Sequence, residues 1–151
     1  MSSITPEEYM EQWLLQKNYP LVYTEIKTNP STGNTVVNFK QDRFLLSEDQ
    51  IPGLIDNSPF GFKWPIYLKC RAGGYINPFN GKKDHLKDGT IDFNYFLVDK
   101  EGSIELDSSY TWIKCNKDFK GYYVTDYPIE IYEAFNELLI NNAGVRDCYF
   151  I

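Results

Sequence analysis

The sequence predicts a mainly β fold, a β-sandwich of about seven antiparallel strands with a helix at each end. Aromatic residues make up 17% of the 151 residues, with 12 Tyr and 10 Phe, and such side chains suit half-buried strands. Apolar and polar residues alternate in several short segments that are separated by turn residues. Helical spacing of apolar residues occurs near the two ends of the sequence. Short strands with turns between them are typical of a sandwich.

The first helix is expected over residues 5–17. Thr5 can cap it, Pro6 suits the first helical position, and Glu8 completes a Thr-x-x-Glu capping box. Pro20 then ends the helix. Its apolar face carries Tyr9, Met10, Trp13 and Leu14.

Two strands follow and form a hairpin. The first begins at Leu21, and the turn residues 29–34 end it. Its alternation places three side chains on one face, Val22, Thr24 and Ile26. The second strand covers residues 35–46 and pairs back across the turn.

The middle of the chain combines loops with one further strand. Residues 47–63 are polar and carry Pro and Gly, so they predict a loop. Residues 64–70 alternate as a strand, with Pro65 at its beginning or on an edge. Residues 73–89 have little apolar periodicity and predict a long, exposed and mobile loop.

Four more strands are expected before the last helix. They cover residues 91–98, 103–106, 110–116 and 121–126. Counting the alternation along the last two strands directs Trp112 and Tyr122 inward. Replacement of either ring by alanine is therefore expected to cost about 3 kcal/mol or more of stability.

The last helix begins after Pro128 and ends near residues 141–144. Its apolar residues are too numerous for a single face. The helical stripe is predicted to contain Ile129, Tyr132, Phe135 and Leu139, with Ile131, Leu138 and Ile140 beside it. A small sandwich can cover only part of this helix, so we expect an exposed apolar patch near the C-terminal end.

Composition argues against several classes of partner. The formal net charge of −6 repels phosphate backbones and anionic lipid, so neither nucleic acid nor membrane contact is expected. No apolar stretch approaches the roughly 20 residues that cross a bilayer, and the N-terminus lacks a signal-peptide pattern. The compartment stays undecided between cytoplasm and an extracellular or membrane-anchored protein.

The sequence provides no residues for a recognisable catalytic or metal site. A zinc peptidase of the His-Glu-x-x-His type needs two imidazoles on one helix face, whereas His85 is the only histidine. His85 lies in a Lys/Asp-rich segment and is expected to be solvated. The acidic residues between 84 and 107 do not form a calcium-binding loop. We therefore predict no catalytic, cofactor-binding or metal-binding residue in this chain.

Three cysteines, Cys70, Cys115 and Cys148, do not match the spacing of a zinc motif. Free, mainly structural thiols are the favoured interpretation. A bridge between Cys70 and Cys115 or an intermolecular contact is the alternative.

Three stretches occur together in the order typical of one family. The first is residues 10–22, MEQWLLQKNYPLV; the second is QDRFL at 41–45 followed by WPIYL at 64–68. The third is WIKCN at 112–116, with GYY at 121–123 and then Tyr127. In this order and spacing the chain resembles the M1 (gluzincin) zinc aminopeptidases, in the region that follows their catalytic domain.

The resemblance implies a division of the chain into three parts. Residues 1–20 would be the end of the preceding catalytic domain's last helix, 21–127 the β-sandwich domain, and 128–151 the first helix of a following α-helical domain. The family's zinc motif and peptide-binding residues would lie upstream, so zinc and peptide substrate are expected only in the parent protein. The partners of this piece would be the neighbouring domains.

The function that follows is a non-catalytic structural module, which spaces the catalytic and helical domains of an M1-like parent. Two departures from the family pattern are the Val-Thr-Asp-Tyr-Pro stretch at 124–128 and the long segment 73–89. The alternative function is an extracellular immunoglobulin-like adhesion or binding module, for which no terminal helices are expected.

Overall fold

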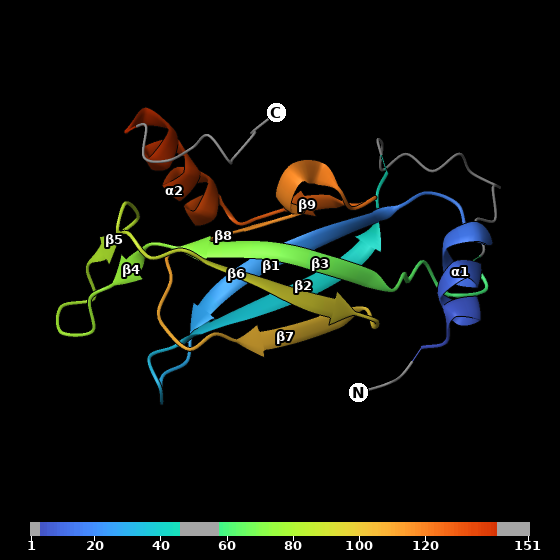
Figure 1. Cartoon of the computed structure of the whole chain (residues 1–151), viewed down its shortest axis with the longest axis horizontal. Coiled ribbons are helices and arrows are strands. Elements are labelled where there is room, and N and C mark those ends of the chain that lie inside the picture. Colours follow the sequence, from blue (N-terminus) through green and yellow to red (C-terminus); the bar gives the residue numbers. More distant parts are fainter. Residues whose placement is uncertain (1–3, 46–57, 142–151) are drawn as a thin grey trace.

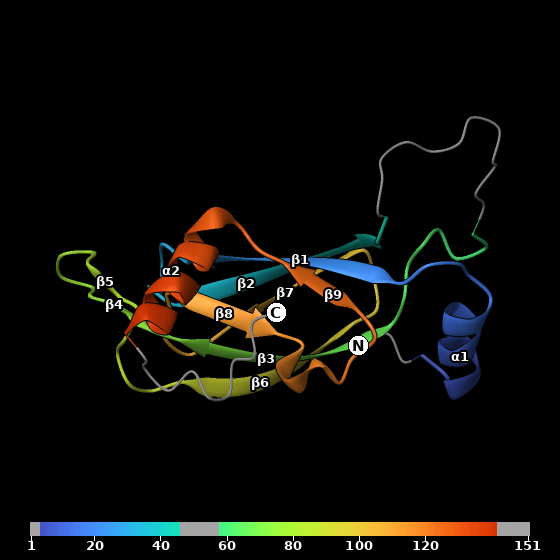
Figure 2. The same cartoon turned by 90° about the horizontal axis from the view of Figure 1, so that it is seen from above.

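A computed structural model describes residues 4–45 and 58–141. The described chain is mainly β, with nine strands and a helix at each end, which confirms the predicted fold class. One sheet has four strands in the order β7-β2-β1-β9 and another has three in the order β6-β3-β8. Figure 2 shows β1 and β2 in one layer above β3 and β6 in the other. The two helices lie near opposite ends of these layers (Figure 1).

The elements are shorter than the predicted segments at most of their ends. The helices are α1 (Pro6–Leu14) and α2 (Ile129–Ile140), with a 3₁₀ turn η1 (Lys117–Phe119). The strands are β1 (Pro20–Thr28), β2 (Thr35–Arg43), β3 (Ile66–Gly73), β4 (Tyr75–Ile76), β5 (Lys83–Asp84), β6 (Ile91–Leu97), β7 (Glu101–Glu105), β8 (Trp112–Cys115) and β9 (Val124–Asp126).

The hairpin of β1 and β2 is antiparallel over its whole length, from Pro20 opposite Arg43 to Thr28 opposite Thr35. Strand β9 instead runs parallel to β1, with Leu21 opposite Val124, where the expected strands were all antiparallel. The chain passes from the three-stranded sheet to the four-stranded sheet between β8 and β9. This passage lets β9 lie on the outer side of β1 without a hairpin.

The core fills the space between the inner faces of the two sheets. Val22 and Thr24, two of the three side chains expected on one face of the first strand, are fully buried, and Ile26 packs beside them, so this face of β1 is the inner one. The side-chain amide of buried Gln41 forms hydrogen bonds with the backbone of Trp64, which precedes β3. Gln41 Nε2 donates to Trp64 O, and Gln41 Oε1 accepts from Trp64 N. A buried polar side chain is tolerated when it is hydrogen-bonded in this way.

Helix α1 begins at the predicted cap. Thr5 accepts from the Glu8 backbone N–H, and the Glu8 carboxylate accepts from the Thr5 N–H, which confirms the capping box. No α1 residue is fully buried. Two side chains nevertheless fix the helix to the sandwich, because Trp13 Nε1 donates to Pro65 O at 3.1 Å and Gln16 Nε2 donates to Lys63 O at 2.6 Å.

Helix α2 packs through a different stripe from the predicted one. The buried residues are Ile131, Ala134, Phe135 and Leu138, whereas Ile129, Tyr132, Leu139 and Ile140 are exposed. Both sets follow the helical period, so spacing alone does not select between them. Phe135 belongs to the predicted stripe as well as to the buried one, and its ring meets Trp112 and Tyr127 edge to face. The two stripes differ in their other members, and the buried one continues through Ile131, Ala134 and Leu138.

Two further expectations about the strands are wrong. Residues 73–89 contain the short antiparallel hairpin of β4 and β5 rather than an unstructured loop. Trp112 is buried as predicted, but Tyr122 is exposed and Tyr123 is buried in its place. Leu46, the part of the predicted loop within residues 46–57, Cys148 and the predicted end of the last helix beyond residue 141 lie outside the described residues.

Candidate functional site

A groove with a volume of about 620 Å³ lies between α2 and strands β8 and β9. We call it the α2 groove. Its lining is dominated by rings and aliphatic side chains, including Phe119, Tyr123, Val124, Tyr127, Tyr132, Phe135 and Leu139. Lys114, Asn116 and Asn136 supply polar groups. A hollow of this size and character can hold a small ligand or the side chains of a packing partner.

A disulfide bond joins β8, which contributes Cys115 to the lining of the α2 groove, to β3. Cys70 and Cys115 face each other in the antiparallel pairing of β3 with β8, with their Cα atoms 4.0 Å apart, and are bonded. Free thiols were the favoured prediction for this pair, and that prediction is wrong. The bridge was the stated alternative, but its geometry depends on which residues of two separated strands stand opposite each other.

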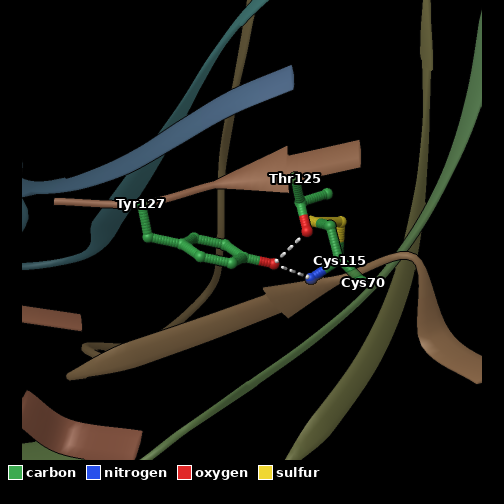
Figure 3. The surroundings of a disulfide bond; sticks show 4 residues. All are labelled: Cys70, Cys115, Thr125 and Tyr127. Atoms are coloured by element: carbon green, nitrogen blue, oxygen red, sulfur yellow. Dashed lines mark hydrogen bonds between the residues drawn. A yellow bond between two sulfur atoms is a disulfide. The ribbon is translucent and has the colours of Figure 1, made fainter. Parts of the chain in front are cut away.

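Tyr127 links the disulfide-bearing strand to β9 (Figure 3). The Cys115 backbone N–H donates to the Tyr127 hydroxyl at 2.8 Å, and this hydroxyl lies 3.1 Å from Thr125 Oγ1. These contacts cross from one sheet to the other, so β8, β9 and the start of α2 form one fixed wall.

Two tyrosines of the α2 groove remain neutral around pH 7. Burial, and then the hydrogen bond from the hydroxyl to Asp126 at 2.7 Å, raise the pKa of Tyr132 to about 12. Burial also raises the pKa of Tyr123 to about 12. The hydroxyls of Tyr123 and Tyr132 therefore stay protonated and can donate hydrogen bonds.

The exposed side of α2 continues the apolar surface of the α2 groove. Its side chains are Ile129, Tyr132, Leu139 and Ile140, and we call this set the outer face of α2. Ile140 is 73% exposed. An exposed apolar patch was expected here, and Ile131, Leu138 and Ile140 were the residues expected beside the helical stripe. Of these three, Ile131 and Leu138 are buried and Ile140 is exposed, so the patch consists of other residues than expected.

His85 is part of an arrangement that resembles a nucleophile, a base and a carboxylate. Its Nδ1 lies 2.8 Å from Thr111 Oγ1 and its Nε2 lies 3.9 Å from Glu137 Oε2. His85 is thus partly buried, contrary to the expectation of a solvated residue. Thr111 is buried and so tightly packed that a Cβ on Gly74 would lie inside its contact distance.

A substrate would not reach Thr111 in this packing, and neither His85 nor Thr111 lines the α2 groove. Nucleophilic catalysis needs an accessible oxygen beside its base. The His85 backbone carbonyl also accepts from Trp112 Nε1 at 3.1 Å. His85, Thr111 and Glu137 therefore connect the end of the β4–β5 hairpin to β8 and α2, which is a structural role.

Among residues 4–45 and 58–141, no three His, Cys, Asp or Glu residues come close enough together to hold a metal ion. No helix in the described part of the chain has the length and apolar character needed to cross a membrane.

A comparison with the sequence patterns of known protein families finds none that matches this chain.

Proposed function

We propose that this chain is a non-catalytic β-sandwich spacer in an M1 aminopeptidase-like protein, and that α2 packs against a helix of a neighbouring helical domain. The observation that carries the proposal is the outer face of α2 beside the α2 groove. Soluble proteins rarely leave a continuous apolar surface uncovered, and such a surface marks an interaction site.

The order of motifs supports the same function from the sequence. The tryptophan-bearing helix, the two middle strands and the late WIKCN and GYY stretches follow the order of the M1 sandwich region. The parent would remove N-terminal amino acids from peptides with a zinc ion held in another domain. This chain would contribute the distance and angle between domains.

The elements around α2 suit a rigid spacer. Phe135 packs on Trp112 and Tyr127, and the Cys70–Cys115 disulfide fixes β8 beneath them. Because one side of α2 is packed on the sandwich, a partner bound to its other side would be held at a fixed distance and angle from the sandwich. The helices at both ends favour this function over the adhesion module, for which we expect no terminal helices.

The first experiment tests the non-catalytic part of the proposal. The purified chain is incubated with aminoacyl p-nitroanilides in the presence of zinc, and its metal content is measured by elemental analysis. We expect no hydrolysis above the buffer rate and no stoichiometric zinc, because the two imidazoles of the zinc motif are missing from the sequence. One tightly held zinc per chain together with hydrolysis would overturn the proposal.

The second experiment tests the outer face of α2. Sedimentation velocity of the isolated chain at increasing concentration is expected to show weak self-association, since the outer face of α2 is exposed among the described residues. The double variant Leu139→Ser, Ile140→Ser should remain monomeric. The control is Phe79→Ser, because Phe79 is 95% exposed but lies in the β4–β5 hairpin, away from α2. Equal loss of association in both variants, or a monomer at every concentration, would contradict the proposed docking face.

A further inference from the structure

A second hollow, of about 330 Å³, lies between α1, β3 and the segment from Asn116 to Tyr123. Its volume falls within the range of small-molecule sites, about 300 to 1,000 Å³. Five of the side chains around it are aromatic, Tyr9, Trp13, Tyr67, Tyr122 and Tyr123. We call it the aromatic pocket.

The exposed ring of Tyr122 in the aromatic pocket is held in position by other rings, and the ring of Tyr67 lies 5.9 Å from Lys69 Nζ. The Tyr122 ring lies 5.3 Å from that of Tyr19 and 6.4 Å from that of Trp13. Trp13 is itself fixed through its bond to Pro65 O. Tyr122 is nevertheless 72% exposed, and Tyr67 is 50% exposed. A ring that is fixed but uncovered offers a flat surface for stacking.

The charged lining of the aromatic pocket is entirely basic. It consists of Lys69, Lys117 and Lys120. Two carboxylates lie behind these lysines, since Lys117 Nζ is 2.8 Å from Asp92 and Lys120 Nζ is 3.6 Å from Asp118. Arg71 also binds Asp92. Four cations thus face two anions, a local excess of two positive charges in a chain whose net charge is −6.

We propose that the aromatic pocket binds a small anion that carries a flat ring. The lysines attract the anionic group, and the exposed rings of Tyr122 and Tyr67 stack on the flat part. A neutral aromatic compound would lose the attraction of the lysines. A bare inorganic anion would lose the contact with the rings.

The proposal is separate from docking at the outer face of α2. The aromatic pocket lies beside α1, whereas the outer face belongs to α2 at the other end of the sandwich (Figure 1). Asn116 and Tyr123 line both the aromatic pocket and the α2 groove, so neither residue is used as a test variant.

The test is a titration of the ¹⁵N-labelled chain with 1-naphthyl phosphate, followed by NMR. The reporter is the Trp13 indole N–H signal, because Trp13 lines the pocket while Trp64 and Trp112 do not. We expect a saturable shift of this signal. Under the same conditions, 1-naphthol and inorganic phosphate should bind at least about tenfold more weakly, since each lacks one of the two contacts. Equal binding of 1-naphthol, or shifts confined to residues of the α2 groove, would overturn the proposal.

Matched variants separate binding at the aromatic pocket from a general effect of charge or ring removal. Lys69→Met and Tyr122→Ala should each weaken 1-naphthyl phosphate at least about fivefold. Lys40→Met and Tyr23→Ala remove the same groups from the other sheet, where β1 and β2 lie, and should leave its affinity unchanged. All four side chains are exposed, so the variants are expected to fold. An unchanged affinity in both pocket variants, or equal losses in the control variants, would refute the assigned site.

Discussion

Two adjacent tyrosines provide a sharp test of the fold, because the structure gives them opposite environments. Tyr123 is 6% exposed, and its ring packs so closely on Gly121 that a Cβ there would lie 2.1 Å from it. Its hydroxyl interacts with the backbone of Lys69 and Asn116. Tyr122 is largely exposed, and the ring contacts that its removal would break are those with Trp13 and Tyr19.

The expected magnitudes follow from these environments. Tyr123→Ala removes a buried ring and leaves a cavity between the sheets, so it should lower the free energy of unfolding by about 3 to 5 kcal/mol. Tyr122→Ala removes an exposed ring with two aromatic contacts, which should cost about 1 kcal/mol. The two substitutions change the same atoms, so their difference isolates burial.

The assay is equilibrium unfolding in urea followed by tryptophan fluorescence, with both variants compared with the wild-type chain. A large loss for Tyr123→Ala and a small loss for Tyr122→Ala are expected. The reverse order would mean that the strand is shifted by one residue, because a one-residue shift exchanges the inner and outer faces. The reverse order would therefore agree with the prediction from the sequence that Tyr122 points inward, and it would refute the burial of Tyr123 in the structure.

Three further predictions use the same unfolding assay. Gly73→Ala should cost about 1 to 3 kcal/mol, since its Cβ would lie 2.2 Å from the Trp112 ring; no loss would show that the ring can move away. Reduction of the Cys70–Cys115 bridge, which spans a sequence separation of 45, should cost about 4 kcal/mol, and an unchanged midpoint in dithiothreitol would contradict this. The pKa of Asp92 is lowered from 3.8 to about 2, chiefly by its hydrogen bond with Arg71. The Asp92 carboxylate therefore contributes fully to the stability of the folded chain above pH 3.8, and this contribution is lost as the pH falls through about 2. Its side chain is 50% exposed, which reduces the contribution to about 1 kcal/mol or less, and a wild-type chain as insensitive to acid in this range as Asp92→Asn would refute it.

Short-range chemistry was sufficient to predict much of the fold. The cap at Thr5 requires groups within a few residues of one another, and both of its hydrogen bonds form. The alternation in β1 was sufficient to place Val22 and Thr24 on the same face, and both are buried in the core. Turn residues at 29–34 and the aromatic content were sufficient for the hairpin and for the mainly β class.

The candidate site could be predicted only in outline. The number of apolar residues in the last helix exceeded what one face can bury, and an exposed patch follows from that count alone. The aromatic pocket had no local signal, because its rings come from α1, β3 and the segment after β8. Neither the pairing of Cys70 with Cys115 nor the contacts of His85 could be read from spacing, since each partner is distant in sequence.

The sequence by itself determined both helices and most of the strands, because capping, alternation and turn chemistry act between near neighbours. It did not reveal the short β4–β5 hairpin. Tertiary structure decided which side of each late element faces inward. Between β8 and β9 the backbone has positive φ at Asn116, Asp118 and Phe119, so the alternation counted from Trp112 does not continue to Tyr122. In α2, two stripes share Phe135 and the same helical period, and packing on the sandwich buries the one that also contains Ile131, Ala134 and Leu138. A period fixes the spacing of side chains, but only a packing partner fixes their direction.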